Sequence, residues 1–227
     1  NVKHSNYFTP SGDFFIWYNA ADSNFYSKNI STDSEVNLTK GLEKIFTNDN
    51  NGMPYDAYPI GLLGFEKGNE NIYLKSQFDI WKFDPNGKIK PINITKTGKQ
   101  DSVQFYFQHL RRDSSYLNFD DIMVSSHNYR THDEYLYKCD GEKIEQVSGG
   151  AFKLYDVEKA KNTENYLVRW GNTKQYPDLE IIETDFSKAL KISTLNPQQE
   201  DYNWTKVESF FWTTPDGQKL EGLLYKP

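Results

Sequence analysis

The sequence has 227 residues, with 32 acidic and 26 basic side chains and a formal net charge of −6. The basic residues are scattered along the chain, which excludes the one-sided basic surface typical of nucleic-acid-binding proteins. Mean hydropathy is −0.80. No run of residues approaches the roughly 20 apolar positions that a membrane-spanning helix needs. We therefore expect neither a nucleic-acid partner nor a membrane span.

Aromatic residues make up 16% of the chain, and such rings pack well on the half-buried surface of a β-sheet. The composition therefore favours strands over a helical bundle. Cys139 is the single cysteine, so an internal disulfide is excluded, and we expect a buried thiol rather than a reactive one. The Asn1-Val2-Lys3-His4 start has no Met and no apolar signal segment, which indicates a trimmed or mature chain and leaves the compartment unknown.

Four segments share one order of elements: an apolar strand, a strand of mixed polar and aromatic residues, a turn, and a short strand that ends in an apolar residue and Thr or Ser. The first two copies comprise residues 14–18, 24–28 and 36–39, then 71–74, 79–84 and 92–95. The other two comprise residues 121–125, 134–138 and 144–148, then 166–170, 178–182 and 190–193. A strand-rich repeat of about 40 to 50 residues is typical of β-propeller blades.

The sequence therefore predicts an all-β fold, a partial β-propeller of about four antiparallel blades within residues 1–204. The predicted blades cover about 1–40, 59–96, 102–148 and 149–195. Residues 41–59 are expected to form an inter-blade loop in which 42–46 could form one helical turn, and 103–107 are expected to supply the first strand of the third blade. Each blade alternates side chains to both faces and needs neighbours to cover them. We expect an open arc with exposed end blades that can associate with other molecules.

The last segment, residues 205–227, departs from this repeat. Two strands, 207–213 and 220–227, flank a turn of Pro215, Asp216 and Gly217. Proline presets φ for such a turn and glycine accepts a positive φ. The segment is predicted to be a β-hairpin.

The Thr-Pro-Asp-Gly turn and the strand Leu220-Glu221-Gly222-Leu223-Leu224-Tyr225-Lys226-Pro227 closely resemble a known junction. Serine peptidases of the prolyl oligopeptidase type pass there from propeller to α/β-hydrolase domain. Three upstream stretches, 37–39, 58–65 and 79–87, resemble the propeller of bacterial members related to dipeptidyl aminopeptidases. The resemblance spans nearly the whole chain. It implies a peptidase parent with its own hydrolase domain as partner, peptide substrates, and a periplasmic or secreted location.

The resemblance also implies where the chemistry lies. The family's nucleophile sits in a Gly-x-Ser-x-Gly elbow of the hydrolase domain, a string that this sequence does not contain. The adjacent Glu-Glu pair with which dipeptidyl peptidases hold a substrate amino terminus is also absent. We expect no catalytic residue, no cofactor and no metal site in this chain, which would gate and position short peptides. The alternative is a stand-alone propeller-like module that binds a protein or a glycan, and a small β-sandwich is disfavoured by the fourfold repeat.

Several residues could carry chemistry, and for each a structural role is expected instead. The four histidines lack the spacing of zinc ligands, and the acidic residues lack the register of a calcium loop. Arginines beside an aspartate could hold a carboxylate, but a surface ion pair is expected. The candidates are His4, His109, His127, His132 with Asp133 and Glu134, Asp49, Asp120 with Asp121, and Arg111 with Arg112 and Asp113.

Four Asn-x-Ser/Thr strings occur at Asn29, Asn37, Asn93 and Asn203. Such strings are glycosylation acceptors in eukaryotic secreted proteins. Two of them, at Asn37 and Asn93, coincide with the repeated strand ending, so the repeat explains them without a sugar. Three tryptophans, Trp17, Trp81 and Trp170, are expected to pack between blades rather than to line a ligand groove.

Overall fold

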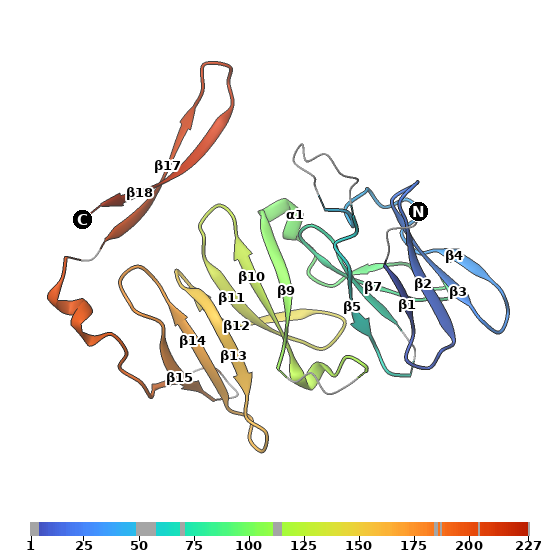
Figure 1. Ribbon diagram of the computed structural model, residues 1–227, viewed down its shortest axis with the longest axis horizontal. Helices are drawn as coiled ribbons and strands as arrows, with labels where there is room; N and C mark the ends of the chain where they lie inside the picture. Colours follow the sequence, from blue (N-terminus) through green and yellow to red (C-terminus); the bar gives the residue numbers. More distant parts are fainter. Residues whose placement is uncertain are drawn as a thin grey trace. The chain divides into compact units, whose positions relative to one another are not determined.

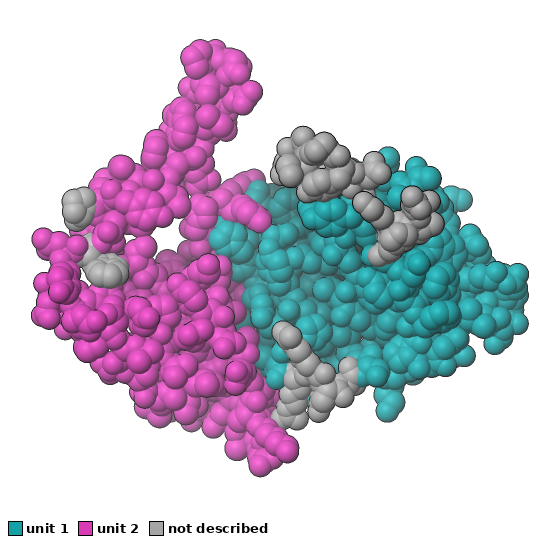
Figure 2. All heavy atoms as spheres, in the orientation of Figure 1, with its two compact units in different colours: residues 1–128, 136–146 teal, residues 129–135, 147–227 magenta. Residues whose placement is uncertain are grey.

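The computed structural model describes residues 5–48, 58–68, 71–110, 115–183, 186, 188–203 and 205–226. The chain divides into two compact units, coloured separately in Figure 2. Unit 1 comprises Asn1–Asn128 with Leu136–Gln146, and unit 2 comprises Tyr129–Tyr135 with Val147–Pro227. None of the helices in the described part of the chain is long and apolar enough to cross a membrane.

Four antiparallel sheets of four strands follow one another along the chain (Figure 1). The first sheet holds β1 (Asn6–Phe8), β2 (Phe14–Asn19), β3 (Asn24–Asn29) and β4 (Glu35–Asn37). The second holds β5 (Leu62–Phe65), β6 (Ile72–Lys75), β7 (Ile80–Phe83) and β8 (Ile92–Asn93). The third holds β9 (Val103–His109), β10 (Ile122–Asn128), β11 (Glu134–Cys139) and β12 (Ile144–Gly150). The fourth holds β13 (Lys153–Lys159), β14 (Tyr166–Gly171), β15 (Asp178–Ile182) and β16 (Ala189–Lys191).

A separate hairpin, β17 (Lys206–Thr213) and β18 (Lys219–Lys226), follows the fourth sheet in sequence. The predicted fold class is confirmed: the chain is all-β, and its four-stranded antiparallel sheets are the blades of a partial β-propeller. The prediction that residues 103–107 open the third sheet is also confirmed, because β9 pairs with β10 along its whole length.

Residues 42–46, in the predicted inter-blade loop, do not form the helical turn that the sequence allows. The backbone there forms tight turns, in which the Leu42 N–H donates to the Thr39 carbonyl at 3.1 Å and the Ile45 N–H donates to the Glu43 carbonyl at 2.6 Å. A short helix, α1 (Gly98–Asp101), occurs instead in the next inter-sheet connection. Asp79 Oδ1 accepts a hydrogen bond from the Gly98 N–H at 2.9 Å, so a residue of the second sheet holds the first turn of this helix.

The core of unit 1 consists of two clusters of buried side chains. The first joins the facing sides of the first two sheets, and the second joins the second sheet to the third. The first cluster contains Phe14, Ile16, Tyr18, Phe25, Leu38, Phe46, Phe65, Ile72, Leu74 and Phe83. The second contains Tyr73, Ile80, Ile94, Phe105, Val124 and Cys139. Strand β6 sends Ile72 and Leu74 to one cluster and Tyr73 to the other, as the alternation of a strand requires.

Hydrogen bonds between neighbouring sheets add to these apolar contacts. Ser27 Oγ, on β3, donates to the carbonyl of Pro85 in the β7–β8 turn. Tyr73 Oη, on β6, donates to the carbonyl of Gly141 in the β11–β12 turn at 2.9 Å. In both cases the last hairpin turn of one sheet rests on the preceding sheet.

Candidate functional site

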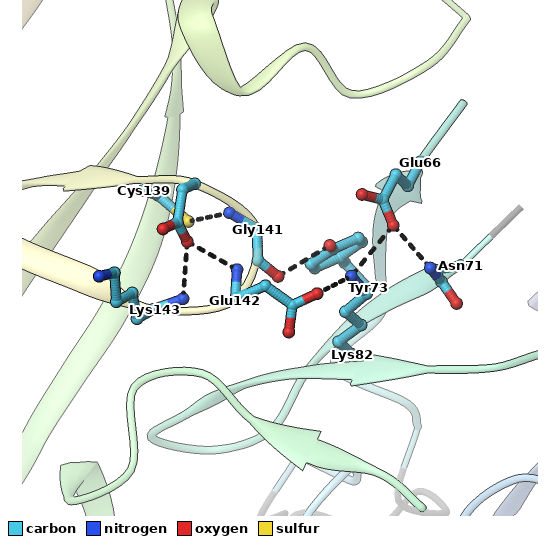
Figure 3. Close-up of polar contacts among 9 residues, drawn as sticks. Glu66, Asn71, Tyr73, Lys82, Cys139, Gly141, Glu142 and Lys143 are labelled. Atoms are coloured by element: carbon cyan, nitrogen blue, oxygen red, sulfur yellow. Dashed lines mark hydrogen bonds and ion pairs between the residues drawn. The ribbon is translucent and has the colours of Figure 1, made fainter. Parts of the chain in front are cut away.

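A polar cluster lies between the second sheet and the β11–β12 turn in unit 1 (Figure 3). Lys82, on β7, pairs with Glu142 of that turn and with Glu66 at 3.1 Å. Its side chain is only 10% exposed, and its ammonium group lies 5.8 Å from the centre of the Tyr73 ring. Glu66 also accepts a hydrogen bond from Asn71 Nδ2 at 2.6 Å. A buried cation thus has two acidic partners contributed by different parts of the chain.

The protonation states of this cluster fit a structural contact rather than a catalytic one. Burial lowers the pKa of Lys82, but its hydrogen bonds to Glu142 and Glu66 outweigh burial and hold the pKa above its ordinary value. Burial raises the pKa of Tyr73 and that of Cys139, the latter to about 11. Nucleophilic cysteines need a lowered pKa. Cys139 is buried and is therefore an inert core thiol, as the sequence predicts.

A pocket of about 660 Å³ lies at one end of the second sheet, within unit 1. Its walls are the connection after the first sheet, the β6–β7 turn and the connection that contains α1. Apolar side chains line much of it, namely Leu42, Ile45, Phe78 and Trp81. Lys99 forms an ion pair with Glu43, so two charged lining residues from different connections are joined. This volume and mixed lining fit a small ligand or one side chain of a peptide.

The indole of Trp81 adds a polar feature to this region. Its Nε1–H is buried and has no hydrogen-bond partner among the described residues. A buried donor without an acceptor costs about 1–3 kcal/mol. The Trp81 ring packs edge-on against Phe46, with centroids 6.1 Å apart. Trp81 therefore packs against the core, as the sequence predicts, and in addition lines the pocket.

Lys75, at the end of β6, is an isolated cation in unit 1. Its Nζ lies 3.4 Å from the centroid of the Tyr106 ring, and within the described part of the chain it has no ion pair. Burial alone lowers the pKa of Lys75 to about 8. A lysine with this pKa is partly neutral near physiological pH.

The histidines do not assemble into a metal site within the described residues, where no group of three or more His, Cys, Asp or Glu side chains could hold an ion. His109 ends β9 and His127 lies on β10, whereas His132 lies in the β10–β11 turn. His132 Nε2 lies 3.1 Å from Glu221 Oε1 of the terminal hairpin, within unit 2. His4 lies outside the described residues.

The acidic candidates have turn roles. The Asp120 N–H donates to Asn118 Oδ1 at 3.2 Å, and Asn118 Nδ2 donates to Asp121 Oδ2 at 2.9 Å, which closes the 3₁₀ turn η1 (Phe119–Asp121). This agrees with the structural role expected for Asp120 and Asp121. Asp49 and the Arg111, Arg112 and Asp113 group lie outside the described residues.

In three of the four Asn-x-Ser/Thr strings, the asparagine side chain accepts a hydrogen bond from a nearby backbone N–H. Asn37 Oδ1 accepts from the Thr39 N–H at 3.2 Å, and Asn93 Oδ1 accepts from the Thr95 N–H at 3.1 Å. Asn29 Oδ1 accepts from Ser31 N–H at 3.0 Å in the β3–β4 turn. The structural explanation predicted for Asn37 and Asn93 therefore holds.

The other two tryptophans have different surroundings. Trp17 belongs to neither core cluster of the described residues and stacks on Phe15 and Tyr26 on the other face of the first sheet, so its packing between blades stays a prediction. Trp170 stacks on Phe152 and donates from Nε1 to Glu180 Oε2 at 2.7 Å.

Sequence reasoning missed Lys82, Lys75 and the pocket. A lysine inside the apolar run Ile80-Trp81-Lys82-Phe83 was a usable signal, because a charge at a core position needs a partner. The partner Glu142 lies 60 positions away, and no local pattern indicates it. The pocket depends on three connections that meet only in the folded unit.

No protein-family model and no curated protein matches this sequence. Three solved structures illustrate what it is similar to, and each match covers 98% of this chain. A variant of the AtxE2 isopeptidase is 9% identical, with a TM-score of 0.33 over 56% of its own length. An oligogalacturonate lyase in complex with manganese is 8% identical, with a TM-score of 0.39 over 76% of its length. The acylaminoacyl peptidase of Pyrococcus horikoshii is 10% identical, with a TM-score of 0.31 over 50% of its length.

The chain thus spans about half the length of the two peptidases that it matches. The three structures have different activities, and likeness at this level selects none of them for the present chain.

Proposed function

We propose that the chain is the propeller module of a serine-peptidase-type hydrolase, and that it gates and positions short peptides for a catalytic domain packed against the hairpin β17–β18. The observation that carries this proposal is the surface of that hairpin. Its sequence resembles the propeller-to-hydrolase junction, and its apolar side chains lie exposed on both faces.

The register of the hairpin assigns each side chain to a face. Phe210, Trp212, Leu220 and Leu224 share one face, and Phe211, Leu223 and Tyr225 share the other. Every one of these seven side chains is more than a third exposed, with Phe211 at 66% and Tyr225 at 62%. A two-stranded hairpin is only marginally stable in water, and exposed apolar patches mark interaction sites. Both faces of the hairpin therefore suit burial inside a larger sheet structure.

Gly222 shows that one face is already organised for side-chain packing. The rings of Phe210 and Trp212 stack with centroids 5.1 Å apart. A Cβ atom at Gly222 would lie 2.8 Å from Phe210 Cε1 and 3.1 Å from Trp212 Cζ3, so glycine leaves the space that these rings occupy. The stacked pair forms a preorganised apolar surface, which supports docking of a further layer.

The proposed division of labour leaves bond cleavage to the catalytic domain. A propeller that restricts access to an active site contributes by selecting and orienting substrates. The pocket at the end of the second sheet offers one place where a peptide side chain could bind.

Assays with chromogenic dipeptide and proline-containing substrates test this division. The isolated chain is expected to bind peptides weakly and to hydrolyse none of them. Turnover that survives purification and is blocked by a serine-directed inhibitor would contradict the proposal.

A second candidate function, a stand-alone ligand-binding module, is favoured by the pocket itself. The signal of the Trp81 indole N–H in a ¹H–¹⁵N spectrum reports on this region. If the module is a receptor, a capped amino acid such as N-acetylphenylalanine amide should shift this signal. Lys99→Ala should then change the affinity, while Lys88→Ala should not. A shift that is insensitive to Lys99 would argue against this candidate.

A further inference from the structure

The pocket at the end of the second sheet has an apolar wall made of partly buried side chains. These side chains are Leu42, Ile45, Phe78 and Trp81. The two rings come from the β6–β7 turn and from β7, and the aliphatic pair comes from the connection after the first sheet. An aromatic group placed against this wall would remove apolar surface from water. The volume of about 660 Å³ leaves room for one such group together with polar atoms beside it.

The exposed charges of the pocket lining are not balanced. Glu43, Lys96 and Lys99 line the pocket and are exposed, so cations outnumber anions among them by two to one. Lys99 forms an ion pair with Glu43, and the hydrogen bond from its ammonium group holds the pKa of the Glu43 carboxyl below its ordinary value. Lys96 forms no ion pair with any described residue. The surplus charge at the exposed edge of the pocket is therefore positive.

The remaining charged residue of the lining, Asp79, has a structural role. It is only 5% exposed. Its Oδ1 accepts hydrogen bonds from Thr95 Oγ1 at 2.6 Å and from the Gly98 N–H at 2.9 Å. Its Oδ2 accepts one from the Lys99 N–H at 3.3 Å. Because these donors occupy the buried carboxylate, an incoming group meets the exposed lysines of the lining and not this aspartate.

Lys96 has a backbone conformation that lysine rarely adopts. Its φ is +66°, in the left-handed region that glycine enters without a steric penalty. Asn93 holds this conformation, since its Oδ1 accepts from the Lys96 N–H at 2.8 Å and its Nδ2 donates to the Lys96 carbonyl at 3.4 Å. Lys40, which follows Thr39 as Lys96 follows Thr95, has no positive φ, so the repeat does not impose it. Strained residues of this kind cluster at ligand clamps.

We propose that the pocket binds the carboxyl-terminal residue of a short peptide, with an aromatic side chain against Phe78 and Trp81 and the terminal carboxylate beside the Lys96 ammonium group. This inference rests on the proposed function, in which the chain positions short peptides, and it names the end of the peptide that is held. A carboxylate complements the surplus cation of the lining, and a charge-assisted hydrogen bond from Lys96 fixes its position. A peptide amino terminus would find only Glu43, which Lys99 already pairs.

Titration of the intact chain with three matched probes tests the proposal, with the Trp81 indole signal in ¹H–¹⁵N spectra as the readout. N-acetylphenylalanine carries the ring and the carboxylate, N-acetylphenylalanine amide lacks the charge, and 2-phenylethylamine carries the opposite charge. The acid should bind at least about threefold more tightly than the amide, the effect expected for an exposed ion pair. The amine should bind more weakly than the amide. The advantage of the acid should shrink as the salt concentration rises.

The substitution Lys96→Gly isolates the contribution of the lysine side chain. Glycine adopts a positive φ without strain, so this variant should fold at least as stably as the wild type. It should bind the acid and the amide with equal affinity, because the cation that distinguishes them is gone. Lys88→Ala removes an exposed lysine that does not line the pocket, and this control should keep the preference for the acid.

Four outcomes overturn the inference. They are equal affinity of the wild type for the acid and the amide, a preference for the amine, a preference for the acid that survives Lys96→Gly, and no shift up to about 10 mM acid. Each of them leaves the proposed function standing, since the hydrolysis assays and the complete native polypeptide test that function separately. Conversely, a native polypeptide without a hydrolase domain would remove the proposed function, while the preference of the pocket for the acid would still be measured.

Discussion

Thr95 Oγ1 donates a hydrogen bond of 2.6 Å to Asp79 Oδ1 and accepts one of 3.1 Å from the Ile80 N–H. The fourth strand of the sheet is thereby tied to the start of the third. Two other sheets repeat the arrangement. Thr39 Oγ1 donates to Asn24 Oδ1 and accepts from the Phe25 N–H, and Ser193 Oγ donates to Asp178 Oδ1 and accepts from the Leu179 N–H. In three of the four copies of the repeat, the Thr or Ser at the end thus joins the last strand to the start of the preceding one.

Replacing Thr95 by Val should lower the free energy of unfolding by about 1–3 kcal/mol, because a buried carboxylate and a buried N–H each lose a partner while the side-chain shape is kept. Urea denaturation measures the change. Thr32→Val, at an exposed turn position, is the matched control and should have little effect. Equal effects of the two substitutions would show that these hydrogen bonds contribute nothing.

Alanine substitutions at Gly141 and Gly12 distinguish the cost of a strained backbone from the cost of a steric clash. Both have positive φ, +86° and +82°, but a Cβ at Gly141 would lie 2.8 Å from Phe119 Cε2 and 3.0 Å from Tyr73 Oη, whereas one at Gly12 meets nothing. Gly12→Ala should cost about 1–2 kcal/mol of stability for the left-handed backbone alone. Gly141→Ala should cost more, since it also disturbs the contact between the second and third sheets. Thermal unfolding of both variants checks the difference, and an equal loss would contradict the contact.

The Lys82 cluster predicts unequal effects of its members. Lys82→Met should destabilise the fold by roughly 1–3 kcal/mol, because Glu66 and Glu142 lose the cation between them. Glu142→Gln should cost much less, since its side chain is 57% exposed and Lys82 keeps its pair with Glu66. Chemical denaturation of both variants measures this order. A reversed order would mean that Glu142, and not Lys82, anchors the contact.

Lys75 predicts a specific pH dependence. Its pKa is lowered from 10.5 to about 8 by burial, so between these values the unfolded chain holds a proton that the folded chain has released. The free energy of unfolding should therefore rise with pH between about 8 and 10.5. The cost of burying the charged amine should be largest below pH 8. The slope is measured as the difference between wild type and Lys75→Met, with Lys90→Met as an exposed control. An identical pH profile for wild type and Lys75→Met would refute the burial of this amine.

The sequence predicts the repeating parts of this fold well, because strand alternation and the Thr/Ser ending are local. It misses β1 and β13, whose residues, such as Tyr7 and Tyr155, carry no clear alternation of their own, and α1, which is too short for a helical period. The helical turn that the sequence allows at 42–46 does not form, because Leu42 and Ile45 pack against the core of the first two sheets and tertiary contact overrides local preference.

The candidate site was less predictable than the fold. The partners of Lys82 and the walls of the pocket come from connections far apart in sequence.

The proposed function is tested most directly by the intact mass and complete sequence of the polypeptide as its source cells produce it. We predict that about 200 or more residues follow the hairpin and contain a Gly-x-Ser-x-Gly string after a strand and before a helix. A native polypeptide that ends within a few residues of the hairpin would contradict the peptidase assignment and leave the stand-alone binding module.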